Sequence, residues 1–195
     1  MQYKLAQIIS TILNPLFILF LLPFILVFET TNSLEKSVYW TIVSLVFLIG
    51  FSLFILMGIS LKYFSDLDIS KRNQRPLLYT VAILFSIVYL FTLFILNAPE
   101  VLAFGTIGLL LGLSINEIIN RFTKSSIHVA AITGLVTLLV LIEGIEFSIF
   151  YFLVFLVAWA RIKTKNHTFN QTIIGALTTF FITILIFVIF KYIIK

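Results

Sequence analysis

The chain contains two histidines, and each stands where a polar segment meets a long apolar run. His128 follows Ser125-Ser126, and His167 follows Arg161 by six residues. A neutral imidazole can attack phosphorus to give a phosphohistidine, while a second imidazole protonates the departing alkoxide. Guanidinium groups bind the oxygens of a phosphoryl group and stabilise its transition state. These residue types together indicate phosphoryl transfer.

A third polar segment, residues 62–76, is the most highly charged stretch of the chain. Its basic residues are candidates for phosphate binding, and its carboxylates are candidates for orienting a histidine ring. The residues concerned are Lys71, Arg72, Arg75, Asp66 and Asp68. The alternative is that the two carboxylates only pair with the neighbouring basic residues through turn or helical spacing.

The composition requires that these side chains be held in a membrane. Of the 195 residues, 61% are hydrophobic and 11% are charged, and the mean hydropathy is +1.18. A soluble domain needs more polar surface than this, and a disordered chain needs low hydrophobicity and high charge. The absence of cysteine excludes disulfides and thiolate metal sites. The few, poorly spaced carboxylates do not suit a two-metal centre, so we expect no metal or cofactor.

Seven apolar runs predict the elements that position the polar segments. We expect an all-α, polytopic membrane bundle of six to seven transmembrane helices, formed as a single domain over residues 1–195. The runs cover residues 5–28, 38–61, 77–96, 101–119, 129–142, 147–159 and 173–194, with Pro15 and Pro23 as kinks in the first.

The distribution of charge predicts how the bundle lies in the membrane. Seven spans put the segments 62–76, 120–128 and 160–168 on one side, together with ten of the 13 basic residues. The positive-inside rule then places these segments in the cytoplasm of a multi-pass cell-membrane protein. The partners that we expect are the lipid bilayer and a membrane lipid phosphate. Nucleic acid is not expected, because the basic residues do not lie on a soluble face.

In their order along the chain, these segments resemble the three motifs of the type-2 phosphatidic acid phosphatase superfamily. Members are integral membrane lipid phosphatases related to vanadium haloperoxidases, with motifs K-x6-R-P, P-S-G-H and S-R-x5-H-x3-D. The resemblance covers residues 68–175 and is carried by Arg75-Pro76, by Ser126-x-His128 and by Arg161-x5-His167.

The resemblance implies the helical core of that superfamily and a role for each matching residue. His167 is the implied nucleophile and His128 the implied general acid on the leaving group. Arg75 and Arg161 are the implied phosphate ligands, and Ser126 aligns with the serine whose backbone or hydroxyl contacts phosphate in the family. Lys71 and Arg72 are the nearest basic residues to the first motif's lysine position, which holds Asp68.

Other departures bear on activity. Ser125 and Ile127 replace the proline and glycine of the second motif, and Ala160 replaces the serine of the third. Gln171 stands where the motif has the aspartate that orients the nucleophile. An amide can orient the ring but cannot stabilise an imidazolium by charge. Asp66 or Asp68 is a possible substitute for that carboxylate.

The function predicted from the sequence is a metal-independent phosphatase acting on a lipid phosphate monoester or diphosphate through a phosphohistidine. Isoprenyl diphosphates, phosphatidic acid and phosphatidylglycerol phosphate are the substrates that the resemblance implies. Two alternatives stay open, a catalytically impaired member of the family and a transporter or flippase for anionic lipids. A transporter would need a polar path through the helices. The polar residues in the helix interiors are mainly Ser, Thr, Asn and a few Tyr, which argues against a transporter.

Overall fold

The computed structural model describes residues 2–193, which form helices and short turns without a strand in that range. Two short 3-10 helices, η1 (Arg72–Gln74) and η2 (Ile145–Phe150), precede α4 and α7. The α-helices are α1 (Gln2–Ile12), α2 (Pro15–Thr31), α3 (Leu34–Ser60), α4 (Arg75–Ile95), α5 (Glu100–Phe122), α6 (Ile127–Glu143), α7 (Tyr151–Lys163) and α8 (Phe169–Ile193).

Six helical segments within residues 2–193 are long and apolar enough to cross a membrane. They comprise α1 with α2, α3, η1 with α4, α5, η2 with α7, and α8. Helix α6 is apolar but has 17 residues, fewer than any of these six segments. The prediction of an all-helical membrane protein is confirmed at this level of detail.

Several helices begin earlier than the apolar runs indicated, and at the starts of α3 and α8 a polar side chain accepts from a free backbone N–H group. Ser33 is the N-cap of α3, and its side chain accepts a hydrogen bond from the backbone N–H of Lys36. The first run is divided at Asn14, whose side chain accepts from the N–H of Leu16. Pro15 starts α2 and Pro23 lies inside it, so only the first of the two prolines coincides with an interruption.

The described chain forms two compact units, and the division falls within α2. Residues 2–19 and 123–193 form one, here called the histidine unit because it contains both histidines. Residues 20–122 form the other, here called the central unit.

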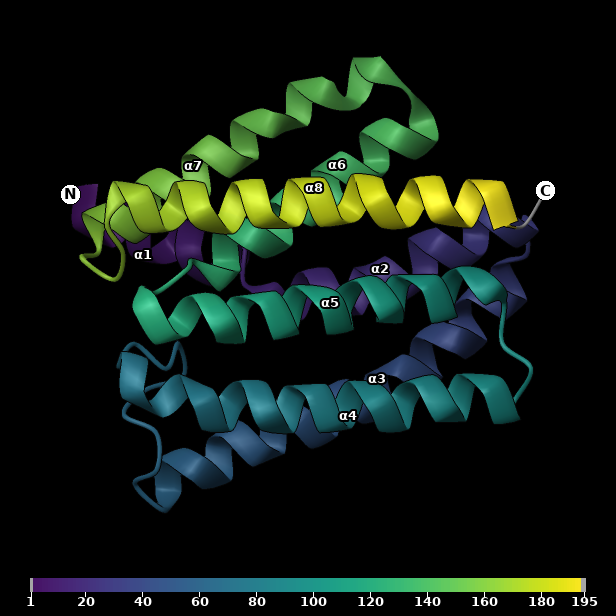
Figure 1. Cartoon of the computed structure of the whole chain (residues 1–195). Helices are drawn as coiled ribbons and strands as arrows, with labels where there is room; N and C mark the ends of the chain where they lie inside the picture. The colour runs from purple at the N-terminus through teal and green to yellow at the C-terminus, as the bar shows by residue number, and fades with distance from the viewer. Residues whose placement is uncertain (1, 194–195) are drawn as a thin grey trace. The chain divides into compact units, whose positions relative to one another are not determined.

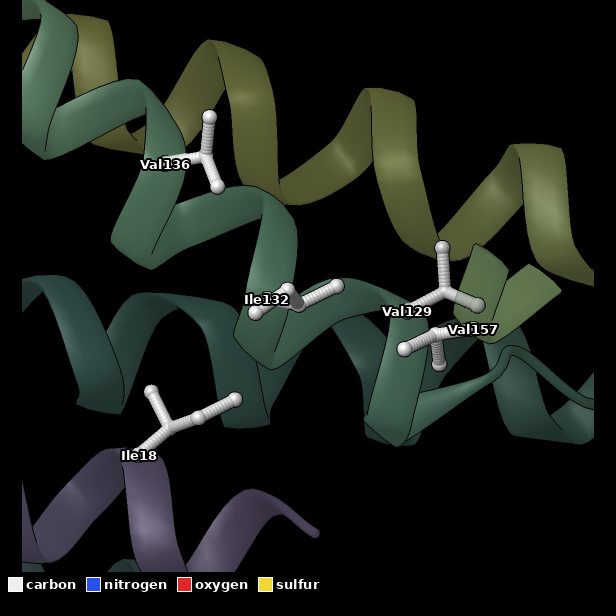
Figure 2. Packing of buried hydrophobic residues seen from close by; sticks show 5 residues of the cluster. All are labelled: Ile18, Val129, Ile132, Val136 and Val157. Atoms are coloured by element: carbon white, nitrogen blue, oxygen red, sulfur yellow. The ribbon is translucent and has the colours of Figure 1, made fainter. Parts of the chain in front are cut away.

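In the histidine unit, α6 lies along α8, and α7 packs against α6 and α1 (Figure 1). The turn from α6 into η2 passes through Gly144, whose φ of 120° favours glycine. Buried aliphatic side chains from α2, α6 and α7 fill the interior of this unit (Figure 2). They are Ile18, Val129, Ile132, Val136 and Val157.

In the central unit, α4 and α5 lie side by side, and α3 packs against α4 (Figure 1). Aromatic side chains join α3 to α4 through the Phe51–Phe85 contact, with ring centroids 5.9 Å apart. The hydroxyls of Ser44 and Tyr89 lie 2.6 Å apart in the same interface. This polar contact satisfies both groups between two apolar helices.

Candidate functional site

The segments that carry the two histidines meet at one end of the histidine unit. The backbone N–H of Ser126 donates to the carbonyl of Gln171 at 3.1 Å, which joins the start of α6 to the first turn of α8. Gly175 allows this approach, since a Cβ at that position would lie 2.6 Å from the carbonyl oxygen of Ser126. Lys124 strengthens the junction, because its Nζ donates to the carbonyl of Asn166 at 3.1 Å.

Gln171 has a structural reason to be a glutamine. The Oγ1 of Thr168 accepts from the backbone N–H of Gln171 at 3.4 Å, and Oε1 of Gln171 accepts from the backbone N–H of Thr168 at 3.2 Å. This reciprocal pair is a capping box, in which a glutamine or glutamate at the third helical position completes the helix start. Position 171 therefore serves the fold of α8 as well as the neighbouring histidine.

The same oxygen of Gln171 fixes the tautomer of His167. Oε1 lies 3.2 Å from Nδ1 of His167 while it accepts from the N–H of Thr168. An atom that accepts from a backbone N–H must be the amide oxygen, so Nδ1 of His167 is the donor in their contact. In the neutral ring, Nε2 then carries the lone pair, which is the requirement for a nucleophile.

Arg161 lies inside the histidine unit, with 2% of its surface exposed. Its Nη1 donates to the hydroxyl of Ser10 in α1, a residue 151 positions away in sequence, at 2.8 Å. The carbonyl of Arg161 accepts from the backbone N–H groups of Asn166 and His167 at 3.1 and 3.2 Å. Because it is buried, Arg161 does not extend along the surface as a membrane anchor.

Ser126 and His128 lie at the start of α6 and are both buried. Ser126 is the N-cap residue, and its side chain makes no capping hydrogen bond. Its Oγ is buried and has no hydrogen-bond partner among the described residues. A helix N-terminus attracts anions through its free N–H groups, and the Ser126 hydroxyl adds a donor at that point.

An open hollow of about 410 Å³ adjoins His167 in the histidine unit. Lys124 and Lys165 contribute positive charge to its lining, and Gln171 is also part of it. The other lining residues are Ile162, Asn166 and Thr168. This composition favours an anionic ligand over a neutral one.

The remaining predicted site residues belong to the central unit. Arg75 is 1% exposed, and its Nε donates to the carbonyl of Ile69 at 3.1 Å. Arg72 is exposed, and its Nη1 donates to the carbonyl of Phe122 at 2.8 Å. Lys71 is exposed at the N-cap of η1.

Asp66 stabilises the turn before η1. Its carboxylate accepts from the hydroxyl of Ser65 at 2.6 Å, and from the hydroxyl and the N–H of Ser70 at 3.0 and 3.1 Å. Burial acts to raise the pKa of Asp66, but these hydrogen bonds outweigh it and hold that pKa below its ordinary value of 3.8. Asp68, the other predicted carboxylate, is half-buried in the same turn.

The lowered pKa of Asp66 makes the turn sensitive to acid. A carboxyl whose pKa is lower in the folded state stabilises the fold at pH values above its ordinary pKa. This contribution is lost as the pH falls through the lowered pKa of the folded state. At pH 7, we expect Asp66→Asn to speed exchange of the Ser70 amide hydrogen roughly two- to fivefold. Hydrogen exchange followed by mass spectrometry measures this, with the Asn97 amide as the internal control. A difference that persists unchanged well below pH 3.8 would contradict the assignment.

Comparison with family models, with curated proteins and with solved structures finds no match for this chain. The geometry and the sequence resemblance are therefore the grounds for a functional proposal. Among residues 2–193, no group of three or more His, Asp or Glu side chains lies close enough to hold a metal ion.

Five of the predicted site residues thus lie in the same packed unit of the structure. His128, His167, Gln171, Arg161 and Ser126 all belong to the histidine unit. Sequence reasoning missed Ser10 as the partner of Arg161, as well as Lys124 and Lys165 in the hollow. In the sequence, the two lysines belong to the ten basic residues that indicate orientation, and a lone serine in an apolar helix gives no signal of its partner.

Proposed function

We propose that the protein is a membrane phosphatase that removes phosphate from a lipid phosphate ester through a phosphohistidine on His167. The observation that carries this proposal is the contact between Nδ1 of His167 and Oε1 of Gln171. It leaves Nε2 as the nucleophilic nitrogen of a ring that borders a lysine-lined hollow. The resemblance in sequence independently gives the same residue the same role.

In the proposed first step, Nε2 of His167 forms a bond to phosphorus while the bond from phosphorus to the lipid oxygen breaks. His128, protonated at the start, gives its proton to the departing alkoxide. In the second step, His128 takes a proton from water as the water attacks phosphorus. The bond from phosphorus to Nε2 then breaks, and inorganic phosphate leaves.

Three further groups of the histidine unit suit the charge that moves in these steps. The resemblance assigns a phosphate contact to Arg161, whose guanidinium is buried and donates through Nη1 to the hydroxyl of Ser10. The hydroxyl of Ser126 and the start of α6 add donors that need no reorganisation. The resemblance assigns a phosphate contact to Arg75 as well, and an Arg75→Ala variant tests that assignment separately.

Release of inorganic phosphate from defined lipids in vesicles tests the proposal. The full-length protein is incubated with phosphatidic acid, phosphatidylglycerol phosphate and an isoprenyl diphosphate, each with and without EDTA. We expect release from at least one lipid, undiminished by EDTA and inhibited by vanadate, which mimics the phosphoryl transition state. A transporter or an impaired family member would release no phosphate from any of the three, and release that EDTA abolishes would contradict the mechanism.

Gln171→Glu separates the capping role of this residue from its catalytic role. Glutamate preserves the capping box, and its carboxylate accepts from both Thr168 and His167. The added negative charge favours the protonated ring of His167, so less of the neutral nucleophile is present at low pH. We therefore expect the acid limb of the pH–rate profile to move to higher pH.

Gln171→Leu is the matched control, because it removes both acceptor contacts without adding charge. We expect it to slow formation of the phosphoenzyme about tenfold or more, the cost of one lost orienting hydrogen bond. An unchanged pH profile in Gln171→Glu, together with full activity in Gln171→Leu, would show that Gln171 acts on the helix alone.

A further inference from the structure

A second hollow lies within the central unit, and the phosphatase proposal does not use it. Its volume is about 390 Å³, within the range of small-ligand sites. It is formed where the segment that leads into α4 meets the end of α5. The lining residues are Arg72, Asn73, Pro76, Glu117, Asn120 and Arg121.

Two guanidinium groups border this hollow. Arg72 is held in place by the hydrogen bond from its Nη1 to the carbonyl of Phe122. Arg121 is free to turn, since its side chain is 69% exposed and its contact with Glu117, at 3.4 Å, is a surface ion pair one helical turn apart. Such exposed pairs contribute little and rearrange readily. Two guanidinium groups at one hollow suit a phosphate.

Asn120 offers a hydrogen-bond acceptor to a ligand in this hollow, whereas the two arginines offer donors. It is 3% exposed, and its Nδ2 donates to the carbonyl of Arg72 at 3.2 Å, which identifies the other terminal atom as Oδ1. This Oδ1 is buried and has no hydrogen-bond partner among the described residues. A buried acceptor without a partner is costly, so the site favours a ligand that brings a donor. The carboxylate of Glu117 offers a second acceptor in the same lining.

A ligand that satisfies both sets of groups carries a phosphate and an N–H donor a short distance apart. The hollow lies at the ends of two candidate membrane spans, Arg72–Ile95 and Glu100–Phe122, where phospholipid headgroups are found. We propose that this hollow binds the headgroup of a zwitterionic phospholipid with a primary ammonium. The phosphate lies between Arg72 and Arg121, and the ammonium donates to Asn120 and Glu117.

Native mass spectrometry of the full-length protein tests this with three lipids of identical acyl chains. Phosphatidylethanolamine provides N–H donors and a positive charge, phosphatidylcholine keeps the charge without N–H donors, and phosphatidylglycerol provides hydroxyl donors and a net negative charge. We expect retention of phosphatidylethanolamine to exceed that of phosphatidylcholine about tenfold, the effect of one charge-assisted hydrogen bond. It should also exceed retention of phosphatidylglycerol.

Variants of the lining residues test whether the preference for phosphatidylethanolamine arises at this hollow. Asn120→Leu and Glu117→Gln should each bring retention of phosphatidylethanolamine towards that of phosphatidylcholine. Glu117→Gln keeps the size of a side chain that is 31% exposed, so we expect this variant to fold. Arg121→Gln should weaken retention of both lipids, while Lys36→Gln, which removes one exposed cation from the start of α3, should not.

Three outcomes would overturn the inference. The first is equal retention of phosphatidylethanolamine and phosphatidylcholine by the wild-type protein. The second is a preference that survives Glu117→Gln undiminished. The third is competition by soluble phosphoethanolamine as strong as that by the lipid, which would show that a free metabolite is the ligand. None of these depends on His167, so the inference and the phosphatase proposal can fail separately.

Discussion

Replacing His167 with alanine is expected to lower phosphate release from the lipid substrate by about 10⁴-fold or more, because it removes the nucleophile. The fold should tolerate this change, since the capping box of α8 depends on Thr168 and Gln171. The measurement is the initial rate of phosphate release in EDTA, together with acid-labile incorporation of labelled phosphate into the protein. Incorporation should be absent in His167→Ala.

His128 gives the matched control, because a general acid matters only when the leaving group is poor. With a lipid alkoxide as leaving group, we expect His128→Ala to lower the rate about 10²- to 10⁴-fold. With p-nitrophenyl phosphate, which leaves without protonation, His128→Ala should retain most of its activity and His167→Ala should not. If both variants lost activity equally on the two substrates, the assigned roles would be wrong. Wild-type rates in His167→Ala would exclude the phosphohistidine.

Gly175→Ala is the second change for which we expect a large effect. Alanine in a helix interior is ordinarily more favourable than glycine by about 1 kcal/mol. Here the added Cβ would lie 2.6 Å from the carbonyl oxygen and 3.2 Å from the backbone nitrogen of Ser126, so backbone must move. Overpacking of this kind costs about 1–3 kcal/mol. It also moves the start of α6, with Ser126 and His128, away from the start of α8.

A displacement of about 1 Å between reacting groups lowers a rate roughly 10²-fold, and we expect this loss in Gly175→Ala even where the protein stays folded. Phosphate release and the thermal unfolding midpoint are to be measured on the same preparation. Gly112→Ala is the control, because its Cβ would meet no atom within 4 Å. Equal behaviour of the two variants would show that the contact between Gly175 and Ser126 does not position the site.

The functional importance of Gly175 could not be read from the sequence. Its neighbours in α8 are ordinary apolar residues, and the contact that requires glycine is with the backbone of a residue 49 positions earlier. Ser10 is a similar case, because its partner Arg161 lies in another helix and is brought to it by the packing of α1 on α7. Contacts of this kind depend on how helices pack, and a single sequence carries no record of that packing.

The helix boundaries also show which features a sequence predicts and which it does not. Hydropathy placed the apolar interiors of the helices, since runs of about 20 apolar residues satisfy their backbone groups inside a bilayer only as helices. It misplaced several ends by two to four residues, at the starts of α3, α4 and α8 among others. The starts of α3 and α8 depend on the side chains of Ser33 and Thr168, which accept from free N–H groups, and these polar residues lower the local hydropathy.

By itself, the sequence determined that the protein is an all-helical membrane protein and that its two histidines stand at the starts of helices, because hydrophobic composition and local order decide both. It also supplied the resemblance from which the phosphatase proposal began. Only the tertiary structure decided that the backbone carbonyl of Gln171, at the start of α8, accepts from the backbone N–H of Ser126 at the start of α6. The physical reason is that this arrangement needs α6 and α8 in direct contact, and that contact depends on the side chains of both helices together rather than on either segment alone.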